Sequence, residues 1–127
     1  MIIINYFEYR INEKVYDWIK DGTKRIEVRL YNEKAKKIEI GDFITFITID
    51  TNKKLDVKVI DLFIYPSLAD LYNDFGSELV ADNSMTLEKI NMTFENIFGK
   101  EKVEKYDVLG IKFVLLEEGL SDNSIFY

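Results

Sequence analysis

The spacing of apolar residues changes abruptly at Gly22, and this change limits what the first third of the chain can form. Before it, apolar residues recur at the spacing of an amphipathic helix: Val15, Trp18 and Ile19. Asn12 suits a helix N-cap and Gly22 suits a C-cap, so we predict a short helix over residues 13–21. After Gly22, apolar and polar residues alternate over residues 26–30, which predicts a strand.

The alternation also assigns the side chains of this strand to two faces. The apolar members are expected to enter the core: Ile26, Val28 and Leu30. Glu27 and Arg29 then share the opposite face, and Tyr31 continues it. Lys24 precedes them at the junction of helix and strand, a position that suits a side chain presented to a cleft. The sequence therefore predicts a small group of charged side chains next to the first helix.

Further apolar runs predict additional strands and helices along the chain. They indicate a strand or extended segment over residues 2–9, a hairpin of residues 43–50 and 55–64, helices after Ser67 and over residues 87–98, and a buried strand over residues 108–116 interrupted by Gly110. This order predicts an α+β fold with a mixed sheet that curls into a small barrel. We expect one domain over residues 1–127, with a core of about 8–116 and a frayed tail over 117–127.

The composition excludes several kinds of chemistry. The 127 residues include no cysteine and no histidine, which rules out disulfides, thiolate metal sites and the commonest general base. The six glycines are dispersed, and no calcium-loop pattern occurs, so we expect neither a cofactor nor a metal. Apolar runs are too short to span a membrane, and the start lacks the features of a secretory signal. We therefore expect a cytoplasmic protein that does not engage membranes.

Charge is unevenly distributed along the chain. The net charge is −6, but residues 1–60 carry +2 and residues 61–127 carry −8. Residues 20–37 form a basic segment with seven cationic side chains: Lys20, Lys24, Arg25, Arg29, Lys34, Lys36 and Lys37. A local positive field of this kind attracts anions even when the whole molecule is acidic.

An ordered set of motifs resembles the ASCH domain, a relative of the PUA RNA-binding fold. It comprises Gly-x-Lys-x-x-Glu-x-Arg at residues 22–29, Ile40-Gly41-Asp42, Tyr65-Pro66-Ser67-Leu68 and a closing strand from Asp107 to Phe113. The resemblance covers roughly residues 8–116. It implies a PUA-like β-barrel with flanking helices and a cleft lined by the first motif. Members of the family are mostly thought to bind RNA or nucleotides.

The resemblance also implies roles for individual residues. The residues implied to bind the ligand are Gly22, Thr23, Lys24, Arg25, Glu27, Arg29 and Tyr31. One branch is similar in fold but acts as an amidohydrolase on N4-acetylcytidine, with a Lys, a Thr and a Glu, and another branch has been linked to RNA cleavage. If this chain is an enzyme, the resemblance implies a metal-independent hydrolase of modified nucleosides or RNA. Here Glu27 stands where that amidohydrolase has its threonine, so a Lys24–Glu27 acid/base pair replaces the expected set. The structural alternatives are a solvated Lys24 and ion pairs of Glu27 with Lys24 or Arg29.

The remaining carboxylate of the amidohydrolase lies after the middle helix. Three acidic residues fall near that place: Asp74, Glu78 and Asp82. Each could complete the site or be an ordinary charged residue on the surface. Two tyrosines besides Tyr31 are candidates to reach the cleft and stack on a base: Tyr65 and Tyr106.

Three functions follow from these patterns. The first is a module that binds RNA or a nucleotide, with the basic segment on the phosphates and the motif on the base or ribose. The second is a small hydrolase of a modified nucleoside such as N4-acetylcytidine. The third is a protein-interaction domain that uses the acidic second half.

Overall fold

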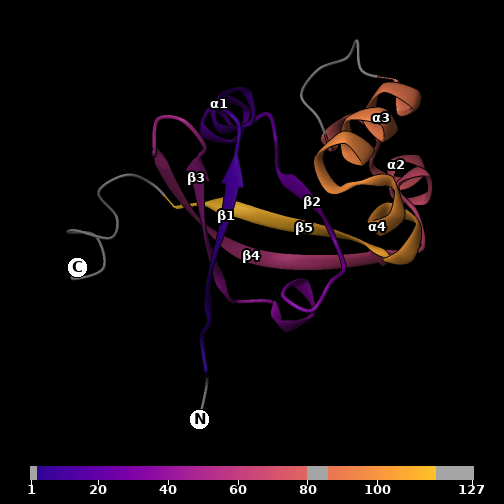
Figure 1. Ribbon diagram of the computed structural model, residues 1–127. Helices are drawn as coiled ribbons and strands as arrows, with labels where there is room; N and C mark the ends of the chain where they lie inside the picture. The colour runs from indigo at the N-terminus through magenta and orange to yellow at the C-terminus, as the bar shows by residue number, and fades with distance from the viewer. Residues whose placement is uncertain (1–2, 80–85, 117–127) are drawn as a thin grey trace, which may run out of the picture.

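A curled five-stranded sheet forms the centre of the computed structural model, which describes residues 3–79 and 86–116 (Figure 1). The strand order is β1-β3-β4-β5-β2. The strands are β1 (Tyr6–Ile11), β2 (Ile26–Leu30), β3 (Phe43–Thr48), β4 (Lys54–Tyr65) and β5 (Val108–Leu115). β1 runs parallel to β3, and the other neighbouring strands are antiparallel. The predicted α+β fold with a mixed, curled sheet is confirmed, and the curl makes a half-barrel whose end strands are β1 and β2.

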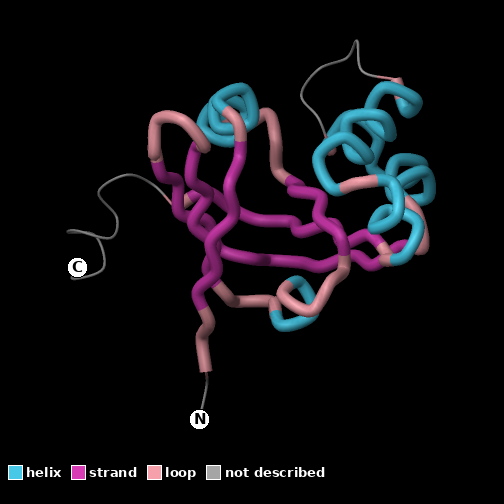
Figure 2. Tube along the Cα trace, in the orientation of Figure 1, coloured by secondary structure: helices cyan, strands magenta, loops and turns pink. Residues whose placement is uncertain are grey.

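Helices occupy two separate places around the sheet (Figure 2). They are α1 (Glu13–Asp21), α2 (Leu68–Phe75), α3 (Leu87–Phe98) and α4 (Lys100–Lys105), with short 3₁₀ turns at η1 (Ala35–Lys37) and η2 (Gly76–Glu78). The first helix, α1, lies apart from α2, α3 and α4, which gather at the other end of the sheet. No helix in the described residues is long and apolar enough to cross a membrane.

The prediction for α1 is confirmed at both ends. The Asn12 side chain accepts a hydrogen bond of 2.8 Å from the Val15 N–H, which satisfies one of the free donors at the start of the helix. Gly22 ends the helix in the left-handed conformation, with φ of 89°, where a side chain is strained. This turn fixes the direction in which the chain leaves α1 and enters β2.

The two faces of the sheet carry separate hydrophobic clusters. One cluster lies inside the half-barrel and includes Ile19 of α1 and residues of the strands such as Phe46 and Phe113. The other lies under α2 and α3 and includes Ile26, Leu30, Leu68, Leu71, Ile90 and Phe94. Glu27 and Arg29 were predicted to share the other face of β2, and the structure adds that their side chains are largely covered: Glu27 is only 7% exposed.

Several predicted boundaries need correction. The first strand begins at Tyr6, within the expected segment but after its start. The hairpin of β3 and β4 is confirmed, and β4 reaches Tyr65. The closing strand β5 passes through Gly110 without interruption, and the irregularity lies in β4 between Val59 and Asp61. α4 was not predicted, and the expected tail over residues 117–127 lies outside the described residues.

Gly110 lies at a point of close packing between β5 and α2. A Cβ atom at this position would lie 3.2 Å from Cδ1 of Leu71 and 3.5 Å from Cγ2 of Ile26. This proximity lets α2 approach the sheet and completes the cluster that supports one side of the candidate site.

Candidate ligand-binding pocket

The predicted motif begins in the turn that joins α1 to β2. The N–H of Lys24 donates to the carbonyl oxygen of Trp18, which closes the chain back onto the helix. Thr23 is held by Asp21, whose carboxylate accepts from both the Thr23 N–H and its hydroxyl. These bonds fix the backbone just before the strand, so the direction of the Lys24 side chain is set locally.

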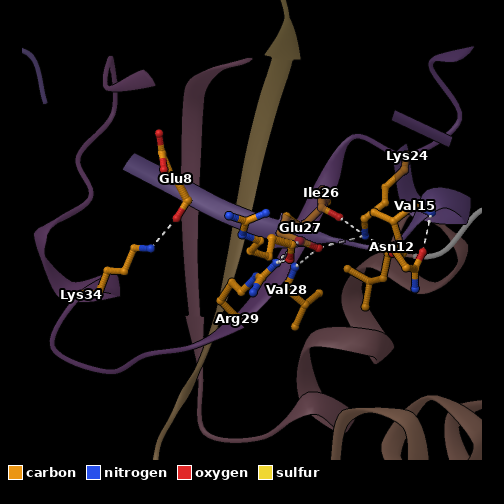
Figure 3. Close-up of polar contacts among 11 residues, drawn as sticks. Glu8, Asn12, Val15, Lys24, Ile26, Glu27, Val28, Arg29 and Lys34 are labelled. Atoms are coloured by element: carbon orange, nitrogen blue, oxygen red, sulfur yellow. Dashed lines mark hydrogen bonds and ion pairs between the residues drawn. The ribbon is translucent and has the colours of Figure 1, made fainter. Parts of the chain in front are cut away.

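Lys24 is buried, with 4% of its surface exposed. Its ammonium donates to the carbonyl oxygen of Ile26 at 2.6 Å and lies 3.6 Å from Oε1 of Glu27 (Figure 3). It also donates to the carbonyl oxygen of Leu79 at 2.5 Å. The two carbonyl groups use two of the three donors of the ammonium, and the contact with Glu27 is an ion pair. Burial lowers the pKa of Lys24; the Glu27 carboxylate opposes this shift, and Arg29 adds to it. The side chain thus ties β2 to the end of η2.

Glu27 accepts hydrogen bonds on both carboxylate oxygens. Oε1 accepts from the Val28 N–H at 3.1 Å, and Oε2 accepts from Nη2 of Arg29 at 2.9 Å. Burial raises the pKa of Glu27, but Arg29, Lys24 and these hydrogen bonds outweigh it, so the pKa lies below its usual value. Glu27 is therefore an anion at neutral pH and the centre of a three-residue charge group.

Arg29 connects the two end strands of the half-barrel. Its Nη2 donates to the carbonyl oxygen of Arg10 on β1 at 2.9 Å, as well as to Glu27. The guanidinium lies 4.4 Å from the centre of the Tyr9 ring, a cation–π contact. Lys34 makes a similar link, because its ammonium donates to the carbonyl oxygen of Glu8 on the same strand (Figure 3). Side chains thus satisfy carbonyl groups along β1, an edge strand.

A pocket of about 290 Å³ opens next to this charge group. We call it the β2–α3 pocket. Its polar lining consists of Arg10, Asn12, Lys24, Glu27, Arg29 and Thr93. Its apolar lining consists of Ile11, Val15, Val28, Ile49, Leu68, Leu79, Ile90, Phe94, Ile97 and Phe98. The pocket therefore combines apolar walls with a few polar groups, as small-molecule sites do.

The structure separates the predicted ligand-binding residues into two groups. Lys24, Glu27 and Arg29 line the β2–α3 pocket. The other four do not line it: Gly22, Thr23, Arg25 and Tyr31. Tyr31 packs against the cluster inside the half-barrel, and the Lys36 ammonium lies 5.8 Å from the centre of its ring. The binding roles of these residues remain predictions.

The other candidates in the described residues do not line the pocket. The Tyr65 hydroxyl donates to the Asp74 carboxylate, Glu78 is exposed on η2, and Tyr106 packs in the cluster under α2 and α3. None of these four lines the pocket, and Asp82 lies outside the described residues. In the described part of the chain, no three acidic side chains gather closely enough to hold a metal ion.

Sequence reasoning missed the wall that α3 contributes. Ile97 belongs to the apolar spacing that predicted this helix, yet it is 63% exposed and lines the pocket. Asn12 was identified only as a helix cap, but it also lines the pocket. An apolar residue of helical spacing gives no sign of whether it faces a core or a cavity, so no local signal marks this wall.

Comparison with known proteins supports one family. The family model for the ASCH domain matches residues 10–117. No curated protein sequence matches the chain. The crystal structure of the hypothetical protein PH0355 is 28% identical and superposes with a TM-score of 0.78, covering 88% of this chain and 100% of the other. The solution structure of PF0455 from Pyrococcus furiosus is 29% identical, with a TM-score of 0.72 and coverage of 90% and 100%.

A structure described as an ASCH domain also shares the fold. The ASCH domain from Lactobacillus crispatus is 16% identical and has a TM-score of 0.61, with coverage of 87% of this chain and 79% of the other. The family model spans most of the chain, and this structure agrees with it in architecture. The chain belongs to the ASCH domain family.

Proposed function

We propose that this chain binds RNA or a nucleotide in the β2–α3 pocket. The observation that carries the proposal is the meeting of Lys24, Glu27 and Arg29 at one side of a pocket with apolar walls. Its volume of about 290 Å³ lies near the lower end of small-molecule pockets, which span roughly 300–1,000 Å³. The family is generally proposed to bind RNA, which supports the same ligand class.

The basic segment contributes differently from what its sequence suggests. Lys24 is buried and engaged, so it is no free cation for a phosphate. Five exposed members of the segment lie outside the pocket lining: Lys20, Arg25, Lys34, Lys36 and Lys37. In this proposal they attract the phosphate backbone from outside the pocket, a contribution that weakens as salt increases.

A pair of substitutions on α3 tests the proposal. Ile97 lines the pocket, whereas Met92 on the same helix is 58% exposed and does not line it. Fluorescence anisotropy with a short labelled single-stranded RNA and calorimetry with nucleoside monophosphates would compare Ile97→Glu, Met92→Glu and the unaltered protein. We expect Ile97→Glu to weaken binding at least about tenfold, because it puts an anion into the pocket, and Met92→Glu to bind normally. Equal binding by both variants, or no binding by the unaltered protein, would refute the proposal.

Hydrolysis of a modified nucleoside is the second candidate function. It is supported by the contact between Lys24 and Glu27, because burial lowers the pKa of the lysine and the carboxylate stays ionised beside it. This is the arrangement that an acid/base pair requires. Incubation with N4-acetylcytidine between about pH 6 and 9 tests it, with release of cytidine expected. The absence of cytidine across that range would eliminate this substrate.

A further inference from the structure

We infer that the gap between the end strands β1 and β2 binds the phosphates of an RNA strand whose base occupies the β2–α3 pocket, and that Arg10 and Lys34 make these contacts. The inference rests on the proposed function, because it assigns the backbone contacts of the same ligand. We call the gap the β1–β2 seam and define it by the four residues whose side chains or carbonyl groups meet there: Glu8, Arg10, Arg29 and Lys34.

Three cationic residues meet at the seam. The Arg29 guanidinium and the Lys34 ammonium lie 4.4 Å and 4.0 Å from the centre of the same ring, that of Tyr9. Both donate to carbonyl oxygens of β1, Arg29 to that of Arg10 and Lys34 to that of Glu8 (Figure 3). Arg10 is exposed and also lines the β2–α3 pocket. The seam therefore begins at the pocket and continues along β1.

Arg10 and Lys34 have neutral hydrogen-bond partners. Nη1 of Arg10 donates to the side-chain oxygen of Asn52 at 3.2 Å, and Lys34 donates to a carbonyl oxygen. Neither residue forms an ion pair with another residue in the described part of the chain. Lys53, which follows Asn52, is instead paired with Glu13 at 3.2 Å. Because neutral oxygens leave the positive charges of Arg10 and Lys34 uncompensated, both side chains can still attract an anion.

The surroundings of Lys34 also indicate positive charge that the fold does not neutralise. Burial and the nearby Arg29 lower the pKa of Lys34, and Glu8 opposes this shift more weakly. Glu27 pairs with Arg29, but it also pairs with Lys24, so that group keeps one net positive charge. A phosphate bound at the seam would relieve the repulsion between the cations.

The distribution of charge along the chain favours the approach of RNA at this place. Residues 61–127 carry −8, so this half of the chain repels a polyanion, whereas residues 1–60 carry +2 and include both strands of the seam. Exposed arginine and lysine side chains commonly contact phosphates, and such contacts fix the position of a nucleic acid without reading its sequence. The seam would therefore position the strand, and the apolar pocket beside it would receive a base.

The salt dependence of RNA binding tests this inference. Fluorescence anisotropy with a short labelled single-stranded RNA would be measured between about 50 and 200 mM salt for Arg10→Gln, Lys34→Gln and the control Lys53→Gln. Each phosphate contact on a single strand contributes about 0.7 to the slope of log affinity against log salt concentration. We expect the slope to become shallower by about 0.7 in each seam variant and to stay unchanged in Lys53→Gln.

Two further variants separate loss of a phosphate contact from loss of folding. Lys34→Arg keeps the positive charge at the seam, so it should keep the salt slope of the unaltered protein. Glu8→Gln removes the acidic side chain of the seam, so it should bind RNA about two- to threefold more tightly. A misfolded protein would not show this gain in affinity.

The outcomes separate this inference from the proposed function. An unchanged slope in Arg10→Gln or Lys34→Gln, or an equal loss of slope in Lys53→Gln, would overturn the seam as the phosphate site. The proposed function would stand in that case if Ile97→Glu still weakens RNA binding. Normal RNA binding by Ile97→Glu, as an acidic surface ligand outside the pocket would also show, would overturn both, and so would the absence of RNA binding by the unaltered protein.

Discussion

Arg29 on β2 donates a hydrogen bond of 2.9 Å to the carbonyl oxygen of Arg10 on β1, the strand at the opposite end of the sheet order. The same Nη2 atom also donates to Glu27, so one guanidinium group joins the two end strands to the charge group of the motif. The β2–α3 pocket lies at this junction. The motif therefore stabilises the half-barrel and lines the pocket at the same time.

Replacing Arg29 is expected to destabilise the protein strongly. Arg29→Ala leaves the buried Glu27 carboxylate with one cation fewer and removes the link to β1, so the free energy of unfolding should fall by about 3 kcal/mol. Urea denaturation measures this loss. Arg25→Ala provides the control, because Arg25 is exposed, and its effect should stay within about 0.5 kcal/mol. Similar small losses in both variants would show that the junction contributes little.

Stability should decrease as the pH falls, partly through Glu27. Burial raises the pKa of Glu27, but Arg29, Lys24 and the hydrogen bonds lower it by more than burial raises it. The carboxyl group therefore holds its proton less tightly in the folded protein than in the unfolded chain. The resulting stabilisation is present above the unfolded pKa of about 4.3 and is lost as the pH falls through the folded value. Urea denaturation between about pH 3 and 7 should therefore show a steeper loss for the unaltered protein than for Glu27→Gln. Parallel pH profiles would contradict this assignment.

Asn12 is expected to have two separable roles. Its Oδ1 caps α1, and the residue also lines the pocket, where its amide is an N–H donor. Asn12→Asp keeps the capping oxygen, so the free energy of unfolding should change by less than about 0.5 kcal/mol. The substitution removes the amide donor, so nucleotide binding should weaken roughly threefold or more. Asn12→Ala should lose about 1 kcal/mol of stability as well. Paired denaturation and calorimetry distinguish the roles, and unchanged nucleotide affinity in Asn12→Asp would limit Asn12 to the cap.

Local patterns predicted the elements of the fold more successfully than the environment of the site. The helix from Glu13 to Asp21 and the hairpin of β3 and β4 depend on neighbouring residues, such as the Asn12 cap, and both were predicted. The alternation of β2 also placed Glu27 and Arg29 on one face. It did not show that this face is buried, because burial there results from the curl of the whole sheet.

Long-range contacts explain the rest of the difference. Lys24 was predicted to face a cleft, and it does line the pocket, but its ammonium is held by the carbonyl oxygen of Leu79, 55 residues away. The wall formed by α3 likewise depends on how α2 and α3 pack over β2. A single sequence carries no local signal for such contacts. The hydrogen bonds of the Lys24 ammonium and the position of Ile97 in the pocket wall could therefore be found only from the structure.

Packing between Gly110 and Leu71 should be sensitive to a single methyl group. Gly110→Ala brings a Cβ atom to 3.2 Å from Cδ1 of Leu71, and this crowding is expected to cost about 1–3 kcal/mol of stability. The loss should be smaller in a Leu71→Val background, where the side chain is shorter. A double-mutant cycle in urea measures this coupling. Additive effects would show that the two residues do not constrain each other.

The most direct test of the binding site is an amide NMR titration of the ¹⁵N-labelled protein with uridine monophosphate. Binding in the β2–α3 pocket predicts the largest shift changes at residues 10–15, 24–29 and 90–98, which contribute most of its lining. Ile97→Glu should abolish these changes, and Met92→Glu should preserve them. Changes confined to the exposed basic residues Lys36 and Lys37, or the absence of any change, would contradict a nucleotide-binding pocket at this position.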